Sequence, residues 1–496
     1  MGQRPVWKAA GVRWTAGWLV LVLWSAGLAQ TAVQPRAIPA LPPQQQVQPA
    51  PEVSAAQQAF SEVAAQLLGE YGGLSAVDRQ ALIREYQGRL DAVCQAQGPR
   101  CAADTAYPVI EAQLTALGDP HTFLQWPDEY QEFLSSALGG DRVQYGVKLA
   151  DLDGERRLVT EVIPGSAAAQ AGLRRGDVLL TLNGVAYTYR ALTDAREASQ
   201  AVRLGVDRQG QRLSVSLQAA RTSAAELPRL SWVGERGRTA LIRIPTFLAG
   251  GRVAVAVHRQ VAWAQARGAD GVVVDLRGNA GGSLLECDLA ASAFVPRFER
   301  VSQSADGPQQ MVVQGGQRRD DAQLIGAVPA PQLWRGPLAV LVDQSSASCA
   351  EFFAYEVQRA GVGQVVGEAT AGVGNTATRV YAVTGGAGLQ MTVLHYAKPG
   401  GVAYPVRVQP DLTVQSGEAF LRALAQGRDL TLEAGLQASV ASRVMDWPAP
   451  TPPWVNRGCA RNSRGDGRIF TAVLRVGRAG TDAMRPSSCS GWRLEY

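Results

Sequence analysis

The strongest constraint on the fold is an alternation of short apolar runs and amphipathic segments between residues 236 and 415. The apolar runs have the length and the β-branched content of buried strands, and they are Thr239–Ile244, Gly271–Asp275 and Leu338–Asp343. Helices are expected at Val253–Ala266, from Ser283 and from about Ser348. Strands that alternate with helices pair in parallel and are covered on both faces. We therefore expect an α/β domain built on a mostly parallel sheet.

Two other folded regions are expected ahead of this domain. Apolar residues recur at helical spacing in the first, as in Phe60, Val63 and Leu67, and the second consists of short apolar runs separated by Gly, Asp and Asn. The chain is expected to divide into a signal peptide (1–29), a Pro/Gln-rich linker (30–51), a helical N-terminal domain (52–140), a β-rich domain (141–220), the α/β core (226–440) and a C-terminal tail without an assigned role (441–496).

The N-terminus has the pattern of an export signal. Arg4, Lys8 and Arg13 precede a mostly apolar stretch, Trp14–Trp24, and small residues follow at Gly27–Ala29. The stretch is short for a membrane span, which needs about 20 apolar residues. We expect an extracytoplasmic protein of the periplasm, cell envelope or medium, with membrane association only through an uncleaved N-terminal segment.

Six cysteines fit an oxidising compartment. Cys94 with Cys101 and Cys459 with Cys489 are plausible disulfide pairs, although spacing alone does not fix pairing. Cys287 and Cys349 fall in the expected core, where a cysteine packs as a small apolar residue.

Charge and composition exclude several classes of function. The net charge is +5, and Lys and Arg form no stripe with interleaved aromatic residues, so a nucleic-acid partner is not expected. No metal or cofactor signature is visible. Arginine stays protonated and is a poor general base. The side chains suited to proton transfer include only three lysines and three histidines, namely Lys8, Lys148, Lys398, His121, His258 and His395.

Four segments together resemble one family. They are Leu117–Thr122 (LGDPHT), Val162–Ala168 (VIPGSAA), Asp275–Gly282 (DLRGNAGG) and Ser346–Glu351 (SASCAE). In this order they are similar to the signatures of C-terminal processing (tail-specific) serine peptidases with a PDZ domain, over about residues 55–435. The resemblance implies a multidomain α/β fold with an N-terminal helical region, a β-rich PDZ domain and a peptidase core of the ClpP/crotonase-like type.

The resemblance implies a serine nucleophile at Ser348. A helix start offers unpaired N–H groups and a dipole that stabilise a developing anion. The same resemblance assigns oxyanion donors to Gly281, Gly282 and Cys349. Considered alone, these glycines are also explained by a tight turn, and the serines before the helix by capping.

The stretch Tyr145, Gly146 and Val147 resembles the loop with which PDZ domains bind a C-terminal carboxylate while the peptide adds as a strand. The expected partner is therefore a polypeptide or its C-terminus. Gln144 stands where the family commonly has glycine, so an ordinary strand entry is the alternative.

The pattern breaks at the general base. The family's lysine position is Val373 in this chain, and the position of its assisting glutamine is Ala377. Some relatives use histidine in the region that matches Leu117–Thr122, which makes His121 the first candidate base and a structural loop histidine the alternative. The remaining candidates are weaker. They are Lys398, its neighbour His395, and the poorly placed Lys148, with Glu351 and Glu368 as groups that could orient a base but are better explained as helix-surface and loop residues.

Two functions remain open. The first is an exported serine-type endopeptidase that cleaves polypeptides captured through the PDZ domain, without a metal or cofactor. The second is an inactive pseudopeptidase that binds peptides or scaffolds an extracytoplasmic complex, as the substitution at Val373 suggests.

Overall fold

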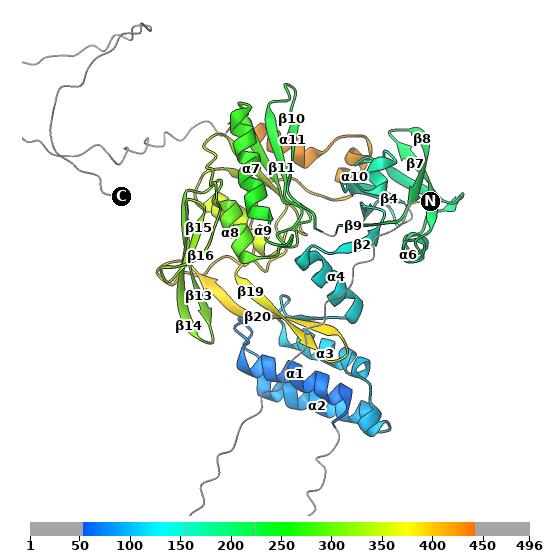
Figure 1. The fold of residues 1–496 in the computed structure, drawn as a ribbon, viewed down its shortest axis with the longest axis vertical. Coiled ribbons are helices and arrows are strands. Elements are labelled where there is room, and N and C mark those ends of the chain that lie inside the picture. The colour runs from blue at the N-terminus through cyan, green and yellow to red at the C-terminus, as the bar shows by residue number, and fades with distance from the viewer. Residues whose placement is uncertain (1–52, 155, 224, 442–496) are drawn as a thin grey trace, which may run out of the picture.

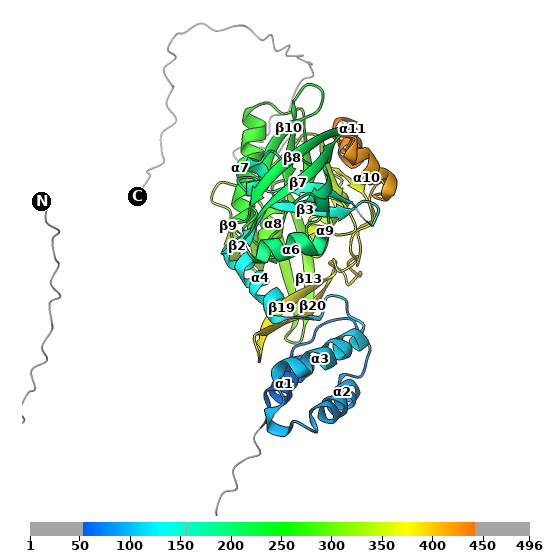
Figure 2. The ribbon, with the colours of Figure 1, turned by 90° about the vertical axis from the view of Figure 1, so that its right-hand side faces the viewer.

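The computed structural model describes residues 53–154, 156–223 and 225–441. The expected signal peptide, the linker, the second cysteine pair and the tail from residue 442 lie outside these residues. In Figures 1 and 2 the N-terminal helices lie at one end of the molecule, and the β-rich part lies against the part with the parallel sheet at the other end. In the described ranges, no helix combines the length and apolar character that crossing a membrane requires.

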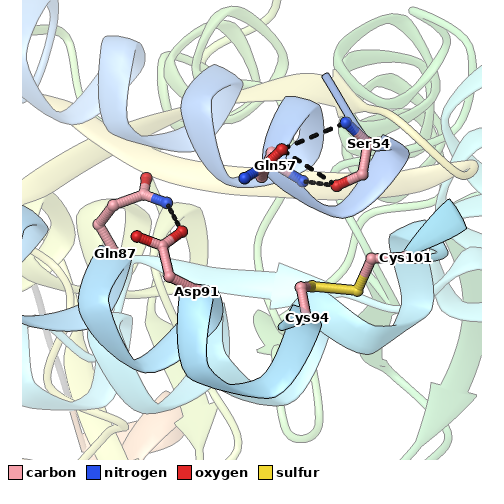
Figure 3. The surroundings of a disulfide bond; sticks show 6 residues. All are labelled: Ser54, Gln57, Gln87, Asp91, Cys94 and Cys101. Atoms are coloured by element: carbon pink, nitrogen blue, oxygen red, sulfur yellow. Dashed lines mark hydrogen bonds between the residues drawn. A yellow bond between two sulfur atoms is a disulfide. The ribbon is translucent and has the colours of Figure 1, made fainter. Parts of the chain in front are cut away.

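Three helices form the N-terminal unit. They are α1 (Ala55–Gly69), α2 (Arg79–Cys94) and α3 (Ala103–Leu117), with a short 3-10 turn, η1 (Gly98–Arg100), before α3. Ser54 caps α1 by accepting a hydrogen bond from the Gln57 N–H at 3.2 Å. The disulfide expected from the sequence, Cys94–Cys101, joins the end of α2 to the segment before α3 (Figure 3).

The β-rich unit has a six-stranded sheet, a separate two-stranded sheet and two short helices. Its elements are β2 (Asp141–Gln144), β3 (Val147–Asp151), β4 (Arg157–Val162), α5 (Ala167–Gln170), β5 (Val178–Leu182), β6 (Val185–Ala186), α6 (Tyr189–Glu197), β7 (Ala201–Arg208), β8 (Gln211–Gln218) and β9 (Ala220–Ser223). The apolar run Val143–Leu149 does not form a single strand, because Gly146 adopts φ 82° and separates β2, which pairs with β9, from β3, which pairs with β4.

The predicted parallel sheet is present. Its order is β10 (Arg229–Val233), β11 (Thr239–Arg243), β12 (Gly271–Asp275), β17 (Leu338–Val342), β18 (Gln364–Gly367), β21 (Leu412–Thr413), and only the β10–β11 pair is antiparallel. Helices α7 (Val253–Ala266), α8 (Leu284–Ala291) and α9 (Cys349–Arg359) cover one face, and α11 (Leu430–Ala441) covers the other. Every residue of β12 and β17 is buried, as expected for central parallel strands.

A second, antiparallel sheet was not predicted from the sequence. Its path is β1 (Phe123–Gln125), β20 (Ala387–Ala397), β13 (Arg297–Ser304), β14 (Gly307–Gln314), β15 (Gln317–Asp320), β16 (Gln323–Ala327), with β19 (Thr376–Val383) also paired to β20. Strand β1 lies in the region that was expected to be helical. Because β1 pairs with β20, the turn before β1 lies next to the α/β part of the chain. Two helices, α4 (Pro127–Leu138) and α10 (Glu418–Ala425), complete the fold.

Charge pairs that are mostly half-buried connect the β-rich unit to the part with the parallel sheet. Glu161 of β4 accepts hydrogen bonds from Arg243, at the end of β11, at 2.9 Å, and from Arg229. Arg277, after β12, lies 2.7 Å from Asp429, which also pairs with Arg175 of the β-rich unit. Since leaving one such charge buried and unpaired is costly, these pairs fix the relative placement of the two units.

The Cys94–Cys101 disulfide is expected to stabilise the helical unit by restricting its unfolded chain. Replacing both residues by alanine should lower the free energy of unfolding by about 2–3 kcal/mol, as the loop-closure relation gives for a short ring. Chemical denaturation of the double variant measures the loss. Dithiothreitol should destabilise the wild type by a similar amount and leave the variant unaffected; an equal effect on both would contradict the assignment.

Candidate active site

Ser348 lies at the junction between the buried strand β17 and helix α9. The turn between them is held by side-chain and main-chain bonds to the turn after β12. The Ser346 hydroxyl donates to the Leu276 carbonyl at 3.0 Å, and the Ala347 N–H donates to the Asn279 carbonyl at 2.9 Å. The two turns that carry the family-like segments are therefore bound to each other.

The main chain of Ser348 has φ 52° and ψ −114°. A positive φ is uncommon for a residue with a side chain and costs of order 1–3 kcal/mol, so the surroundings must hold it. The Ser348 N–H donates to the Glu351 carboxylate at 2.8 Å, and no side-chain hydrogen bond from Ser348 caps the helix. The contact between the Ser348 N–H and Glu351 is that of a capping box at the start of α9.

The glycine turn faces Ser348 closely. A Cβ atom on Gly281, which has φ 98°, would lie 2.8 Å from the Ser348 Cβ, so only glycine fits. The Gly281 N–H donates to the Asn279 Oδ1 at 2.8 Å and is therefore occupied. Within the described residues, the N–H groups of Gly282 and Cys349 have no hydrogen-bond partner, and the Cys349 thiol donates to the Gly282 carbonyl at 3.2 Å. Two unpaired N–H groups thus lie on the segments that flank Ser348.

His121 lies in the turn before β1 and is 6% exposed. Its Nδ1 lies 2.7 Å from the Thr376 Oγ1, and the Thr376 hydroxyl donates to the Val373 carbonyl at 3.4 Å. In the tautomer with the proton on Nδ1, the ring donates to this hydroxyl and Nε2 is the unprotonated nitrogen. Burial lowers the pKa of His121 to about 4, although Asp119 opposes the shift, so the ring is neutral above that pH.

Ser348 and His121 are connected through Glu351 rather than directly. The Val373 N–H donates to the Glu351 Oε2 at 3.0 Å, and Ser348 donates to the same oxygen. Thr376 then links this segment to His121. No hydrogen bond in the described residues joins the Ser348 hydroxyl to His121. The expectation that Glu351 is a helix-surface residue is wrong, because it is 1% exposed.

The other candidate bases have different partners. His395 Nδ1 lies 3.0 Å from the Gly72 carbonyl, and the Lys398 Nζ lies 5.3 Å from the centre of the Tyr355 ring. Lys148 pairs with Glu226 at 3.1 Å and with Glu161.

Two further residues named from the sequence, Glu368 and Ala377, make contacts away from Ser348. Glu368 accepts a hydrogen bond from the Ser416 N–H at 2.7 Å, and Ala377 is buried in β19 beside Thr376. In the parts of the chain that the structure describes, no group of three or more His, Cys, Asp or Glu side chains is arranged to hold a metal ion.

A groove of about 520 Å³ lies beside the stretch from Tyr145 to Val147. Helix α6 lines it with Tyr189 and Arg196. Gly146 is required here, because a Cβ atom would lie 2.0 Å from the Ser166 Cβ. The Gly146 N–H has no hydrogen-bond partner in the described residues, so it is open to a ligand in the groove. Helix α4, from outside the β-rich unit, forms another wall of the groove.

The depressed pKa of His121 predicts a stability change with pH. Between pH 6.5 and about 4 the unfolded histidine binds a proton that the folded one does not, so stability is lost as the pH falls. Relative to His121→Asn, the wild type should lose about 2–3 kcal/mol more between pH 7 and pH 4.5. Urea denaturation of both proteins at the two pH values measures this; parallel losses would contradict the shift.

Comparison with known proteins finds similarity to a known family in each of two parts of the chain. Residues 238–414 match the model of peptidase family S41, and residues 158–208 match that of the PDZ domain. A carboxyl-terminal-processing protease of Picosynechococcus sp. is 28% identical over 314 residues, which are 61% of this chain and 70% of that protein. One of Synechocystis sp. is 26% identical, over 67% of this chain and 76% of that protein.

One solved structure supports the fold as a whole. A Bacteroides fragilis protein described as a "Putative S41 protease" aligns with a TM-score of 0.51 and 17% identity, covering 76% of this chain and 96% of that chain. The predicted fold class is therefore confirmed as a mixed helix and sheet fold with a PDZ domain and a peptidase core. The similarity to peptidase family S41 extends over residues 238–414, and the similarity to PDZ domains extends over residues 158–208.

Proposed function

We propose that this chain is an exported serine-type endopeptidase of the C-terminal processing family, which cleaves polypeptides captured through its PDZ domain. The observation that carries the proposal is the geometry at Ser348. This residue lies between a buried parallel strand and a helix, in a positive-φ conformation, with unpaired N–H groups at Gly282 and Cys349 beside it. Such an arrangement suits a nucleophile and an oxyanion site.

The reaction follows from these groups. The Ser348 hydroxyl attacks the peptide carbonyl carbon, and its proton passes to the base. The oxyanion of the tetrahedral intermediate accepts hydrogen bonds from the Gly282 and Cys349 N–H groups. When the intermediate collapses, the C–N bond breaks and the leaving amine takes the proton from the base. In the second half of the reaction, the base takes a proton from water, which attacks the acyl carbon, and the proton then returns to the Ser348 oxygen as the product acid leaves.

His121 is the base that we propose. Val373, at the family's lysine position, has no group that accepts a proton, while Lys398 and His395 have other partners. His121 is neutral above about pH 4, and Thr376 on Nδ1 leaves Nε2 to accept the proton. This role requires Nε2 to come within reach of the Ser348 hydroxyl, directly or through one water.

Substrate capture is proposed at the groove beside Tyr145, Gly146 and Val147. The open N–H of Gly146 can bind a chain-end carboxylate, and β3 offers an edge to an extended peptide. The N-terminal sequence pattern supports export to the extracytoplasmic space.

A pseudopeptidase that binds peptides is the second candidate. It is favoured by the aliphatic side chain of Val373 and by the lack of a hydrogen bond between Ser348 and a base in the described residues. It would share the PDZ groove with the endopeptidase and lack turnover.

Casein degradation separates the two functions. The wild type should degrade casein, and Ser348→Ala should remove activity because no nucleophile remains. His121→Ala should lower the rate by about 10²–10⁴-fold, the range for loss of a general base. Equal activity of wild type and Ser348→Ala would exclude the peptidase, and peptide binding without cleavage by the wild type would favour the pseudopeptidase.

Two glycine substitutions test the geometry of the oxyanion turn. Both Gly278 and Gly281 have positive φ, but only at Gly281 would a Cβ meet Ser348, whereas nothing lies within 4 Å of one at Gly278. Each alanine should cost about 1–2 kcal/mol of stability from the backbone alone.

Only Gly281→Ala should also abolish labelling of Ser348 by a fluorophosphonate, since the added methyl displaces the nucleophile. Thermal unfolding and gel fluorescence measure the two effects. Loss of labelling in Gly278→Ala as well would mean that backbone strain, and not the contact with Ser348, is responsible.

A further inference from the structure

Glu351 is a buried carboxylate in the first turn of α9, three residues after Ser348. It is 1% exposed and accepts four hydrogen bonds. The donors are the Ser348 N–H at 2.8 Å, the Val373 N–H at 3.0 Å, the Gly372 N–H at 2.8 Å and the Thr370 hydroxyl at 2.5 Å. Two carboxylate oxygens provide about four acceptor sites, so this side chain is fully used.

The four donors belong to two separate segments. Ser348 belongs to the turn before α9, and the other three donors belong to the segment 370–373 between β18 and β19. Oε2 accepts from both segments at once, because it binds the N–H groups of Ser348 and Val373. A single oxygen thus fixes the distance between the serine and the segment that leads to Thr376 and His121.

The surroundings are shaped for this side chain. A Cβ atom on Gly374 would lie 2.7 Å from the Glu351 Cβ, so glycine at 374 makes room for the glutamate. The Thr370 Oγ1, which donates to Oε1, also accepts the Val408 N–H at 2.9 Å and is thereby held in place. Burial raises the pKa of Glu351, and its hydrogen bonds from Thr370 and the main chain only partly offset this effect.

The contact with Ser348 also bears on backbone strain. Ser348 keeps its positive φ only while other interactions outweigh the cost. Its own N–H has one partner, the Glu351 carboxylate. Without an acceptor at this point, the buried N–H would be unsatisfied, and the turn would relax toward an ordinary helix cap.

We propose that Glu351 is a positioning residue for the reaction of Ser348: its carboxylate holds the serine in the positive-φ conformation and joins it to the segment that carries Val373, Thr376 and the contact to His121. This inference rests on the proposed peptidase function. In this proposal the Glu351 carboxylate aligns Ser348 with His121, and position 373 between them has a valine instead of the lysine expected from the family resemblance. The alternative is that Glu351 only stabilises the helix start, as a helix cap does.

Glu351→Gln tests the proposal. Glutamine has the same size, but its NH₂ group cannot accept the N–H groups that Oε1 or Oε2 now bind. Glu356→Gln is the matched control, because Glu356 lies on the same helix, is also 1% exposed, and binds the Tyr404 hydroxyl at 2.6 Å and Arg359 at 2.8 Å, away from Ser348.

Glu351→Gln should slow fluorophosphonate acylation of Ser348 by about 100-fold, the effect expected of a displacement of about 1 Å, and should lower kcat for a peptide substrate with KM changed less than about twofold. Glu356→Gln should acylate at the wild-type rate even where its melting temperature falls. Equal rates for the two variants would overturn the proposal and leave Glu351 as a helix cap.

A second measurement does not depend on activity. Amide hydrogen exchange in peptides that cover residues 345–352 and 370–376 should become faster together in Glu351→Gln and not in Glu356→Gln; exchange that changes in one segment only would overturn the link. Thr370→Val, which removes one of the four bonds, should show the same pattern more weakly if Glu351→Gln fails to fold. Absence of acylation in the wild type would refute the proposed function, and the exchange comparison would still decide the role of Glu351.

Discussion

The structure around Ser348 depends on main-chain hydrogen bonds between two turns that follow neighbouring parallel strands. The Ala347 N–H binds the Asn279 carbonyl, and the Asn279 side chain binds the Gly281 N–H on one side and the Ile244 carbonyl on the other. Asn279 is fully buried, so these bonds are strong relative to any alternative with water. The N–H groups next to Gly282 and Cys349 in the chain all have hydrogen-bond partners, whereas those of Gly282 and Cys349 have none in the described residues.

The same parallel sheet also provides the contacts by which the β-rich unit is attached near Ser348. Parallel strands place their carboxyl ends at one edge, and there Arg243 and Arg277 meet acidic residues. Burial opposes ionisation of Asp275, but Arg277 and Arg243 lower its pKa, so the charges remain paired at neutral pH. The PDZ domain is therefore attached through ion pairs and through an apolar cluster, in which Leu158 and Val178 pack with Phe420 of α10. Helix α4, which follows directly from β1 and the His121 turn, also lines the groove of this domain.

Sequence patterns predicted what depends on local periodicity and failed where pairing is long-range. The runs at Gly271–Asp275 and Leu338–Asp343 are central strands with continuous apolar character, so the parallel sheet was predictable. The antiparallel sheet was not, because β14 and β16 are largely exposed, β15 consists of four polar residues, and β1 has only three residues. Glu351 was misjudged for a related reason: a charged residue at a helix start is typically solvated, and its four donors come mostly from residues about 20 positions away.

The geometry also bears on why a valine can occupy position 373. Its contribution in this fold is the main-chain N–H, which any residue but proline supplies, and which binds the same carboxylate oxygen as Ser348. The protonatable side chain can then come from elsewhere, provided that the segment keeps its place. Thr376 provides that connection, since it orients His121 from the strand that begins three residues later. Valine at 373 therefore leaves intact the hydrogen bonds that hold the Ser348 N–H and this segment to one carboxylate oxygen.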